Sequence, residues 1–262
     1  CIRDRKGAKR PYQIKLDKKT DLLQTGDSAD KAKTWVLLAN FYDPSAVRNM
    51  LALDLGRALQ MECNMGYRPV CLFYDGEFRG LYLLTEKVEV NEGRVDVTDL
   101  EKANEMANPD VEDLTKLESK TGTTANGATY LYCDGMNDPA DITGGYLLEM
   151  DFADRAMEEK CYFITTRGFY VVVKSPEACS KAEMDYIASW YQDYEDAVFE
   201  GGTSSKTGNP FTDYVTVESM VQCYLVNELS KNGDGFNTSA YLYKETGSKP
   251  MKMGPLWDYD LS

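Results

Sequence analysis

The chain has 262 residues, 43% of them hydrophobic and 27% charged, and a formal net charge of −14. This length can bury a substantial core as one large domain or as two joined lobes. The acidic charge argues against a nucleic-acid-binding face and against electrostatic adhesion to an anionic membrane, and no apolar run approaches the roughly 20 residues of a membrane span.

Two apolar segments and a helix are predicted near the start of the chain. Residues 11–16 alternate apolar and polar side chains as a strand does, and residues 35–38 form a second apolar run. A helix is expected to follow, because Asp43 can cap its start and Pro44 suits the first turn. Its buried face should be apolar and should contain Val47, Leu51, Leu55 and Leu59.

A β-hairpin and an acidic segment are expected next. Residues 70–74 and 78–84 flank Asp75-Gly76, which is a strong hairpin turn signal. The strand, helix and hairpin together describe a small α+β unit. Acidic residues outnumber basic ones between residues 92 and 118, and the polar residues 119–127 continue this stretch. We therefore expect a mobile surface insertion there.

The second half is predicted to contain strands and two helices. Apolar runs indicate strands over residues 129–133, 145–150, 161–165, 169–174, 240–244 and 251–253. The first helix starts with a capping box of Ser180 and Glu183, and its apolar stripe is Met184, Ile187, Tyr191, Tyr194 and Val198. The second covers residues 217–231, with a stripe of Met220, Val221, Tyr224, Leu225 and Leu229. Asn232-Gly233 ends it, so Asp234 should lie on a loop.

Carboxylates are the main candidates for chemistry. The sequence has no histidine, which excludes a Ser-His-Asp triad, a Cys-His dyad and histidine-based zinc catalysis. Asp234 lies between a helix and a strand, and Asp258 and Asp260 follow a later strand, an order in which kinases place their base and their metal ligand. Alternatively, the three aspartates form turns. Glu149 and Asp151 lie at a strand end, where either a site or a plain strand exit explains them.

Five sequence runs occur in an order that resembles a known family. They are KRPYQIKL at residues 9–16, DPSAVRN at 43–49, DGEFRGLY at 75–82, NGDG at 232–235 and WDYD at 257–260. Together they span nearly the whole chain and resemble the CotH (spore coat protein H) family of atypical, protein-kinase-like proteins. Only the acidic segment is unmatched.

The resemblance implies an α+β, two-lobed, atypical protein-kinase-like fold with a nucleotide between the lobes. Residues 1–90 would form the small lobe. Residues 91–262 would form the large lobe, with the acidic insertion at about 92–127 and the catalytic and metal-binding loops within 231–262. Asp234 matches the catalytic-loop aspartate of the family, and Asp258 matches its metal-binding aspartate.

Four further residues are candidates for binding the nucleotide under this resemblance. Lys9 is the candidate for contacting the phosphates, and Lys15 is the alternative, since a lysine is a compact point charge suited to phosphate oxygens. Asp54 is a candidate to pair with that lysine, as a helix acid does in ordinary kinases. Glu86 would line the nucleotide pocket or simply face solvent.

The second metal ligand is less clearly marked. Ordinary kinases place an asparagine five residues after the catalytic aspartate, and Ser239 occupies that position here. Asn237 could substitute, or Ser239 could bind the metal through its hydroxyl. Both are therefore candidates beside Asp258.

The resemblance implies a protein kinase that uses ATP and Mg²⁺ or Mn²⁺ to phosphorylate serine or threonine hydroxyls. The expected partner is a serine-bearing protein, such as a basic coat or surface protein, at the spore coat or cell surface of a bacterium. The alternative is a surface adhesin or coat-assembly protein with weak or no catalysis on the same fold. A third class, a glycosidase that uses only carboxylates, fits the lack of histidine.

Overall fold

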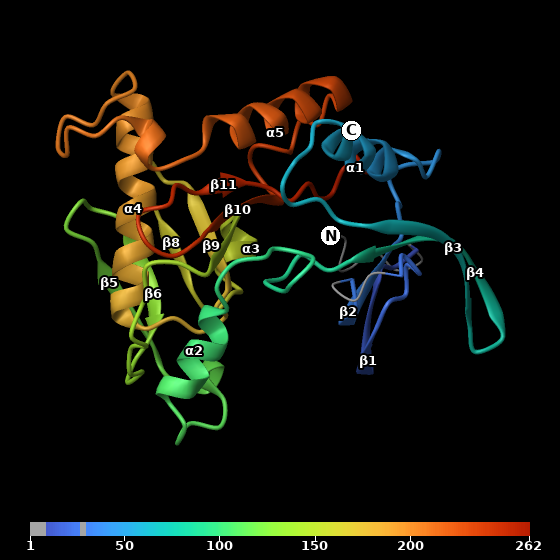
Figure 1. Cartoon of the computed structure of the whole chain (residues 1–262), viewed down its shortest axis with the longest axis horizontal. Helices are drawn as coiled ribbons and strands as arrows, with labels where there is room; N and C mark the ends of the chain where they lie inside the picture. Colours follow the sequence, from blue (N-terminus) through green and yellow to red (C-terminus); the bar gives the residue numbers. More distant parts are fainter. Residues whose placement is uncertain (1–8, 27–29) are drawn as a thin grey trace.

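The computed structural model describes residues 9–26 and 30–262, and it contains helices and two antiparallel β-sheets, which fits the expected α+β class (Figure 1). The N-terminal sheet has the order β1-β2-β4-β3. Its strands are β1 (Tyr12–Thr20), β2 (Ala32–Leu38), β3 (Tyr67–Tyr74) and β4 (Glu77–Glu86). The C-terminal sheet has the order β11-β10-β7-β9-β8-β6-β5. Its strands are β5 (Ser119–Thr123), β6 (Thr129–Cys133), β7 (Tyr146–Met150), β8 (Tyr162–Ile164), β9 (Tyr170–Ser175), β10 (Ala240–Lys244) and β11 (Lys252–Met253).

The predicted hairpin is confirmed. β3 and β4 pair antiparallel, and Asp75 and Gly76 connect them with φ values of 50° and 77°. Two consecutive residues with positive φ are what a tight two-residue hairpin turn requires. In Figure 1 this hairpin extends away from the rest of the molecule.

Helix α4 (Lys181–Phe199) covers the C-terminal sheet (Figure 1). The predicted capping box is confirmed, because the Ser180 side chain accepts from the backbone N–H of Glu183 and the Glu183 side chain accepts from that of Ser180. Met184 and Ile187 are fully buried against sheet residues such as Phe163. The predicted stripe ends before Val198, which is 44% exposed.

The buried face of α1 (Arg48–Ala58) differs from the prediction. Val47 and Leu51 are 46% and 57% exposed, whereas the buried residues are Asn49, Ala52, Leu53 and Gly56. Small residues allow the helix to approach its neighbours closely. A Cβ atom at Gly56 would lie only 2.8 Å from Leu256 Cδ1. Leu55 and Leu59 of the predicted face do pack, partly buried, against the core, so the apolar periodicity identified only part of the packed face.

Helix α5 (Val217–Ser230) contacts α1, and of its predicted apolar stripe only Met220 packs against the core. The exposed residues include Val221, Tyr224, Leu225 and Leu229, and the buried ones are Ser219, Cys223, Val226 and Asn227. Hydrogen bonds hold the buried face, because Ser219 Oγ accepts from Met253 N at 3.0 Å and Asn227 Oδ1 accepts from the Tyr259 hydroxyl at 2.7 Å. The predicted stop is confirmed, since Lys231 adopts φ 56° directly after the helix.

The acidic segment lies largely at the surface, but it is not the irregular stretch that a mobile insertion would be. It contains α2 (Leu100–Ala107), a 3-10 turn at Leu114–Lys116 and β5. Val95 and Leu100 are fully buried. Charged residues surround these few buried apolar side chains, and the average composition of the segment does not indicate them.

One cluster of buried side chains joins the two halves of the chain. Leu53 and Met65 pack there with Leu147, Val226 and Leu256. A boundary near residue 90 remains a prediction. No helix in the described ranges is long and apolar enough to cross a membrane.

Candidate active site

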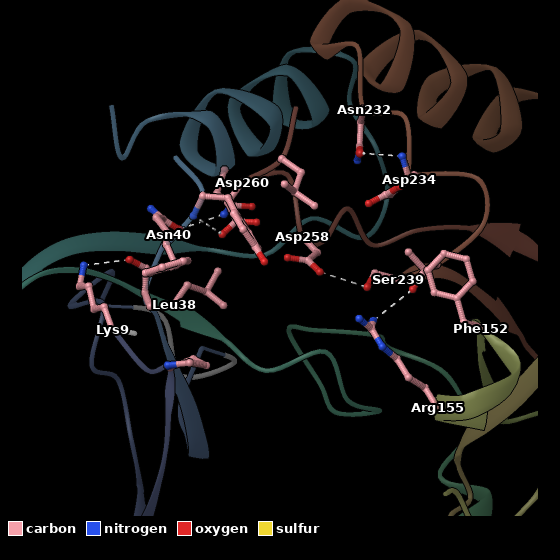
Figure 2. A pocket seen from close by; sticks show the side chains of 18 residues that line it. Lys9, Leu38, Asn40, Phe152, Arg155, Asn232, Asp234, Ser239, Asp258 and Asp260 are labelled. Atoms are coloured by element: carbon pink, nitrogen blue, oxygen red, sulfur yellow. Dashed lines mark hydrogen bonds between the residues drawn. The ribbon is translucent and has the colours of Figure 1, made fainter. Parts of the chain in front are cut away.

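A cavity of about 190 Å³ collects polar residues from segments far apart in the sequence (Figure 2). Residues 38–42, which begin with the last residue of β2, form one side. The short helix α3 (Ala153–Ala156) and the loop between α5 and β10 form another. The segment after β11 contributes the third. The charged lining residues in the described structure are Lys9, Arg155, Asp234, Asp258 and Asp260.

Asp234 lies on a tight loop after α5. Its backbone carbonyl accepts hydrogen bonds from Asn237 N at 2.8 Å and Thr238 N at 3.1 Å. Gly235 must be small, because a Cβ atom there would lie 2.4 Å from Asn227 Oδ1. The loop is thus tied to the buried face of α5, while the Asp234 side chain is exposed at the cavity.

Asp258 is positioned by an anchored neighbour, Tyr259, and by a hydrogen bond from Ser239. Its φ is +64°, a left-handed conformation that costs a non-glycine residue on the order of 1 kcal/mol. The next residue, Tyr259, is anchored on both sides, because its N–H donates to Asn49 Oδ1 at 2.8 Å and its hydroxyl donates to Asn227. The Asp258 carboxylate faces the cavity and accepts from Ser239 Oγ at 3.3 Å (Figure 2).

Asp260 adds a second carboxylate from the same segment. Burial raises its pKa, and the charge of Asp258 raises it further. Its Oδ2 accepts from Tyr42 N at 3.5 Å, and its backbone carbonyl accepts from Arg48 Nη1 at 3.4 Å. Two neighbouring carboxylates that repel each other favour a bound cation.

The oxygen donors in the cavity fit a cation that takes some of its ligands from the protein and the others from a bound substrate and water. Within the described ranges, no group of three or more His, Cys, Asp or Glu side chains is arranged to hold a metal. Mg²⁺ commonly takes one or two protein carboxylates and completes its shell with water and phosphate oxygens. Asp258 is the candidate carboxylate, and the Ser239 hydroxyl lies next to it.

Lys9 lines the cavity from the N-terminal sheet. Its Nζ donates to the carbonyls of Ala39, at 2.8 Å, and Leu81, and lies 4.3 Å from the centre of the Tyr82 ring. Burial lowers its pKa. These contacts hold the ammonium between the end of β2 and the middle of β4.

Four predicted candidates lie outside the described lining of the cavity. Lys15 is exposed on β1, and Asn237 is exposed on the loop after Asp234. Asp54 accepts from Arg57 Nη1 at 2.7 Å and from the Tyr67 hydroxyl, so the expected pairing with Lys9 or Lys15 is not formed. A helix register that points Asp54 away from the cavity explains the difference.

Glu86 is buried within the fold. Its Oε2 accepts from Gly66 N at 2.6 Å, and its Oε1 lies 4.0 Å from Arg94 Nε. Burial raises its pKa. Neither a pocket-lining nor a solvent-facing role describes this carboxylate, which instead connects β4 to the segments around Gly66 and Arg94.

Sequence reasoning missed Arg155, which points into the cavity from α3 (Figure 2). The available signal was its place four residues after Asp151, at helical spacing. Asp151 lies beside the cavity residues and accepts from the Thr238 hydroxyl. Glu149 is buried, and burial raises its pKa; it accepts from the Tyr241 hydroxyl at 2.8 Å and has Lys174 Nζ 3.5 Å away.

The two sheets and this cavity define an α+β protein with a polar, aspartate-rich cavity. A family model described as CotH kinase protein matches residues 3–262. The chain therefore belongs to the CotH kinase protein family, which confirms the resemblance seen in the five sequence runs. No match was found among the curated proteins compared with the chain.

Proposed function

We propose that this protein is a metal-dependent kinase that transfers the γ-phosphoryl of ATP to serine or threonine hydroxyls of a protein. One observation carries the proposal. Asp234 and Asp258 come from different loops, yet they line one cavity and are connected through the loop that contains Ser239. A base and a metal ligand must meet in this way at a phosphoryl-transfer site.

The nucleotide would bind between the N-terminal and C-terminal sheets, which would act as the small and large lobes of a kinase. Lys9 would contact phosphate oxygens from the small lobe, after exchanging a backbone carbonyl for the phosphate. Asp258 would hold Mg²⁺ or Mn²⁺, with Ser239 as a neighbouring oxygen donor. When bound, the cation would neutralise charge on the phosphates.

Asp234 would act on the acceptor. Its exposed carboxylate can accept a hydrogen bond from a serine or threonine hydroxyl and take its proton as the hydroxyl oxygen bonds to phosphorus. The bond from the γ-phosphorus to the bridging oxygen breaks, and that oxygen leaves with ADP. Most of the rate gain would come from positioning and charge stabilisation.

A binding protein without catalysis is the second candidate. Two contacts favour it: the Lys9 ammonium is bound to two backbone carbonyls, and Asp54 pairs with Arg57. In an active kinase the phosphate-binding lysine usually pairs with a helix acid. This candidate, an adhesin or coat-assembly factor, predicts that Asp258→Asn leaves the biological role intact.

The substrate is proposed to be a serine-bearing protein with basic character, because a net charge of −14 attracts basic partners. Membership of the CotH family makes the spore coat or the cell surface of a bacterium the proposed location.

Incorporation of labelled γ-phosphate tests the proposed function. The protein and its Asp234→Asn and Asp258→Asn variants would be incubated with ATP and Mn²⁺, with a basic serine-rich acceptor and without one. Asp17→Asn is the matched control, because Asp17 is exposed on β1, away from the cavity. We expect labelling in the protein and the control and at least a hundredfold less in both variants. Equal labelling in all four would reject the assigned roles.

A further inference from the structure

Arg155 is the one cavity-lining arginine in the described structure, and it faces the two aspartates from the side opposite Lys9 (Figure 2). Its side chain is 43% exposed, so a ligand can reach it. Lys9 comes from the N-terminal sheet and Arg155 from α3, beside the C-terminal sheet. The two cations therefore bracket the cavity.

The Arg155 side chain is held in place, but only some of its N–H donors have a partner in the described contacts. Its Nη1 donates to Thr238 Oγ1 at 3.4 Å and lies 3.6 Å from Asp151 Oδ1, and its guanidinium carbon lies 5.9 Å from the centre of the Phe152 ring. The same Asp151 oxygen also accepts from the Thr238 hydroxyl. A carboxylate shared in this way is a weak partner for the guanidinium, whose five N–H donors can serve a second anion.

Consecutive loop residues link Arg155 to both aspartates. Thr238, which accepts from Arg155, donates its backbone N–H to the Asp234 carbonyl at 3.1 Å. The next residue, Ser239, donates to the Asp258 carboxylate. These contacts thus connect Arg155 to the two segments that carry the proposed base and the proposed metal ligand.

The distribution of charge also favours a cationic side chain at this end of the cavity. Three aspartates line it, while the Lys9 ammonium is engaged by backbone carbonyls at the other end. A phosphoryl group in transfer carries negative charge on three oxygens and lies between the metal and the acceptor hydroxyl. A planar guanidinium matches such oxygens with two parallel hydrogen bonds, which an ammonium cannot provide.

We propose that Arg155 binds the γ-phosphoryl group of the nucleotide, from the side of the cavity that holds Asp234. This inference rests on the proposed kinase function and adds a residue to its site. Arg155 would discriminate ATP from ADP, because ADP has no group at this position. The proposal covers binding in the ground state, so it can be tested without catalytic turnover.

Calorimetric titration with Mn²⁺ complexes of ADP and of a non-hydrolysable ATP analogue tests it. The variants are Arg155→Gln, which removes the charge, and Arg155→Lys, which keeps the charge but cannot form the two parallel hydrogen bonds of a guanidinium. Arg79→Gln is the matched control, since Arg79 is 41% exposed and also faces a carboxylate, that of Glu77, outside the cavity lining. Thermal unfolding would establish that each variant is folded.

We expect Arg155→Gln to weaken binding of the ATP analogue about tenfold or more, with ADP affinity changed less than about twofold. Arg155→Lys should recover part of the loss, and the control should bind both ligands normally. An unchanged preference for the ATP analogue in Arg155→Gln would overturn the proposal while the nucleotide site stands. Equal losses for both ligands would also overturn it. Failure of the unmodified protein to bind either nucleotide would reject the kinase function itself, and this inference with it.

Discussion

Ser239 donates a hydrogen bond of 3.3 Å from its Oγ to Asp258 Oδ2, and this bond joins the loop after α5 to the segment after β11. The two carboxylates of the proposed mechanism lie on these two segments. Ser239 therefore couples the position of Asp258 to that of the Asp234 loop.

Ser239→Ala tests this coupling. Loss of one partly buried hydrogen bond should lower the free energy of unfolding by about 1 kcal/mol or less. Binding of Mn²⁺–ATP should weaken about tenfold, since the metal-binding carboxylate loses its support. Denaturant unfolding and calorimetry measure the two effects. Ser205→Ala, in an exposed loop, is the control; unchanged nucleotide affinity in Ser239→Ala would contradict the coupling.

The packed face of α5 can be tested with two adjacent residues. Val226→Ala should lower the free energy of unfolding by about 2 kcal/mol, because Val226 is fully buried. Leu225→Ala should change it by about 0.5 kcal/mol or less, because Leu225 is 40% exposed. Chemical denaturation of both variants gives the comparison. A larger loss of stability in Leu225→Ala than in Val226→Ala would contradict the packed face seen in the structure.

Glu183 should make stability depend on pH. Burial raises its pKa to about 7, and its Oε1 has no hydrogen-bond partner in the described structure. The folded state thus binds this proton more tightly than the unfolded state. The stabilisation is complete below about pH 4.5 and is lost as the pH rises through about 7, a change of about 3 kcal/mol.

Glu183→Gln isolates that contribution. A neutral glutamine keeps an acceptor for Ser180 N and gains an amide that can donate to Asn104 Oδ1, which is likewise unpartnered among the described residues. Relative to the unmodified protein, the variant should gain stability between pH 5 and pH 8. A difference between the two unfolding curves that is constant with pH would contradict this reasoning.

Lys244 should be a strong contributor to the stability of the C-terminal sheet. It is fully buried, its Nζ donates to the carbonyls of Thr143 and Gly247 at 2.8 Å each, and it lies 4.2 Å from the centre of the Trp190 ring. Lys244→Met removes the donor from these partly buried carbonyls and should lower the free energy of unfolding by about 2 kcal/mol. Lys181→Met, at an exposed position, is the control. A loss below about 1 kcal/mol would show that the carbonyls find other donors.

Local signals in the sequence were reliable where one residue type dictates backbone geometry. Asp75-Gly76 forms the predicted turn, and Ser180 with Glu183 forms the predicted capping box. The buried faces of α1 and α5 were predicted less well. Gly56 is buried because the helix approaches its neighbours closely there, and Asn227 is buried because it forms hydrogen bonds. A hydrophobic pattern indicates neither property.

The candidate site was predicted in part. Asp234, Asp258, Ser239 and Lys9 do line one cavity, as family-like runs in a fixed order suggested. Asp54 and Glu86 have partners outside the cavity. The sequence shows that each is charged, but it does not show whether the carboxylate pairs within the fold or contacts a ligand. Arg155 carried no motif, and only folding brings it to the aspartates.

Binding of ATP with and without Mn²⁺ to Asp234→Asn and Asp258→Asn is the measurement that tests the assigned roles most directly. We expect Asp234→Asn to bind ATP with the metal dependence of the unmodified protein, because Asp234 acts on the acceptor. Asp258→Asn should lose that metal dependence, because it lacks the carboxylate that holds the cation. Metal-dependent ATP binding that survives in Asp258→Asn would contradict the proposed division of roles between the two aspartates.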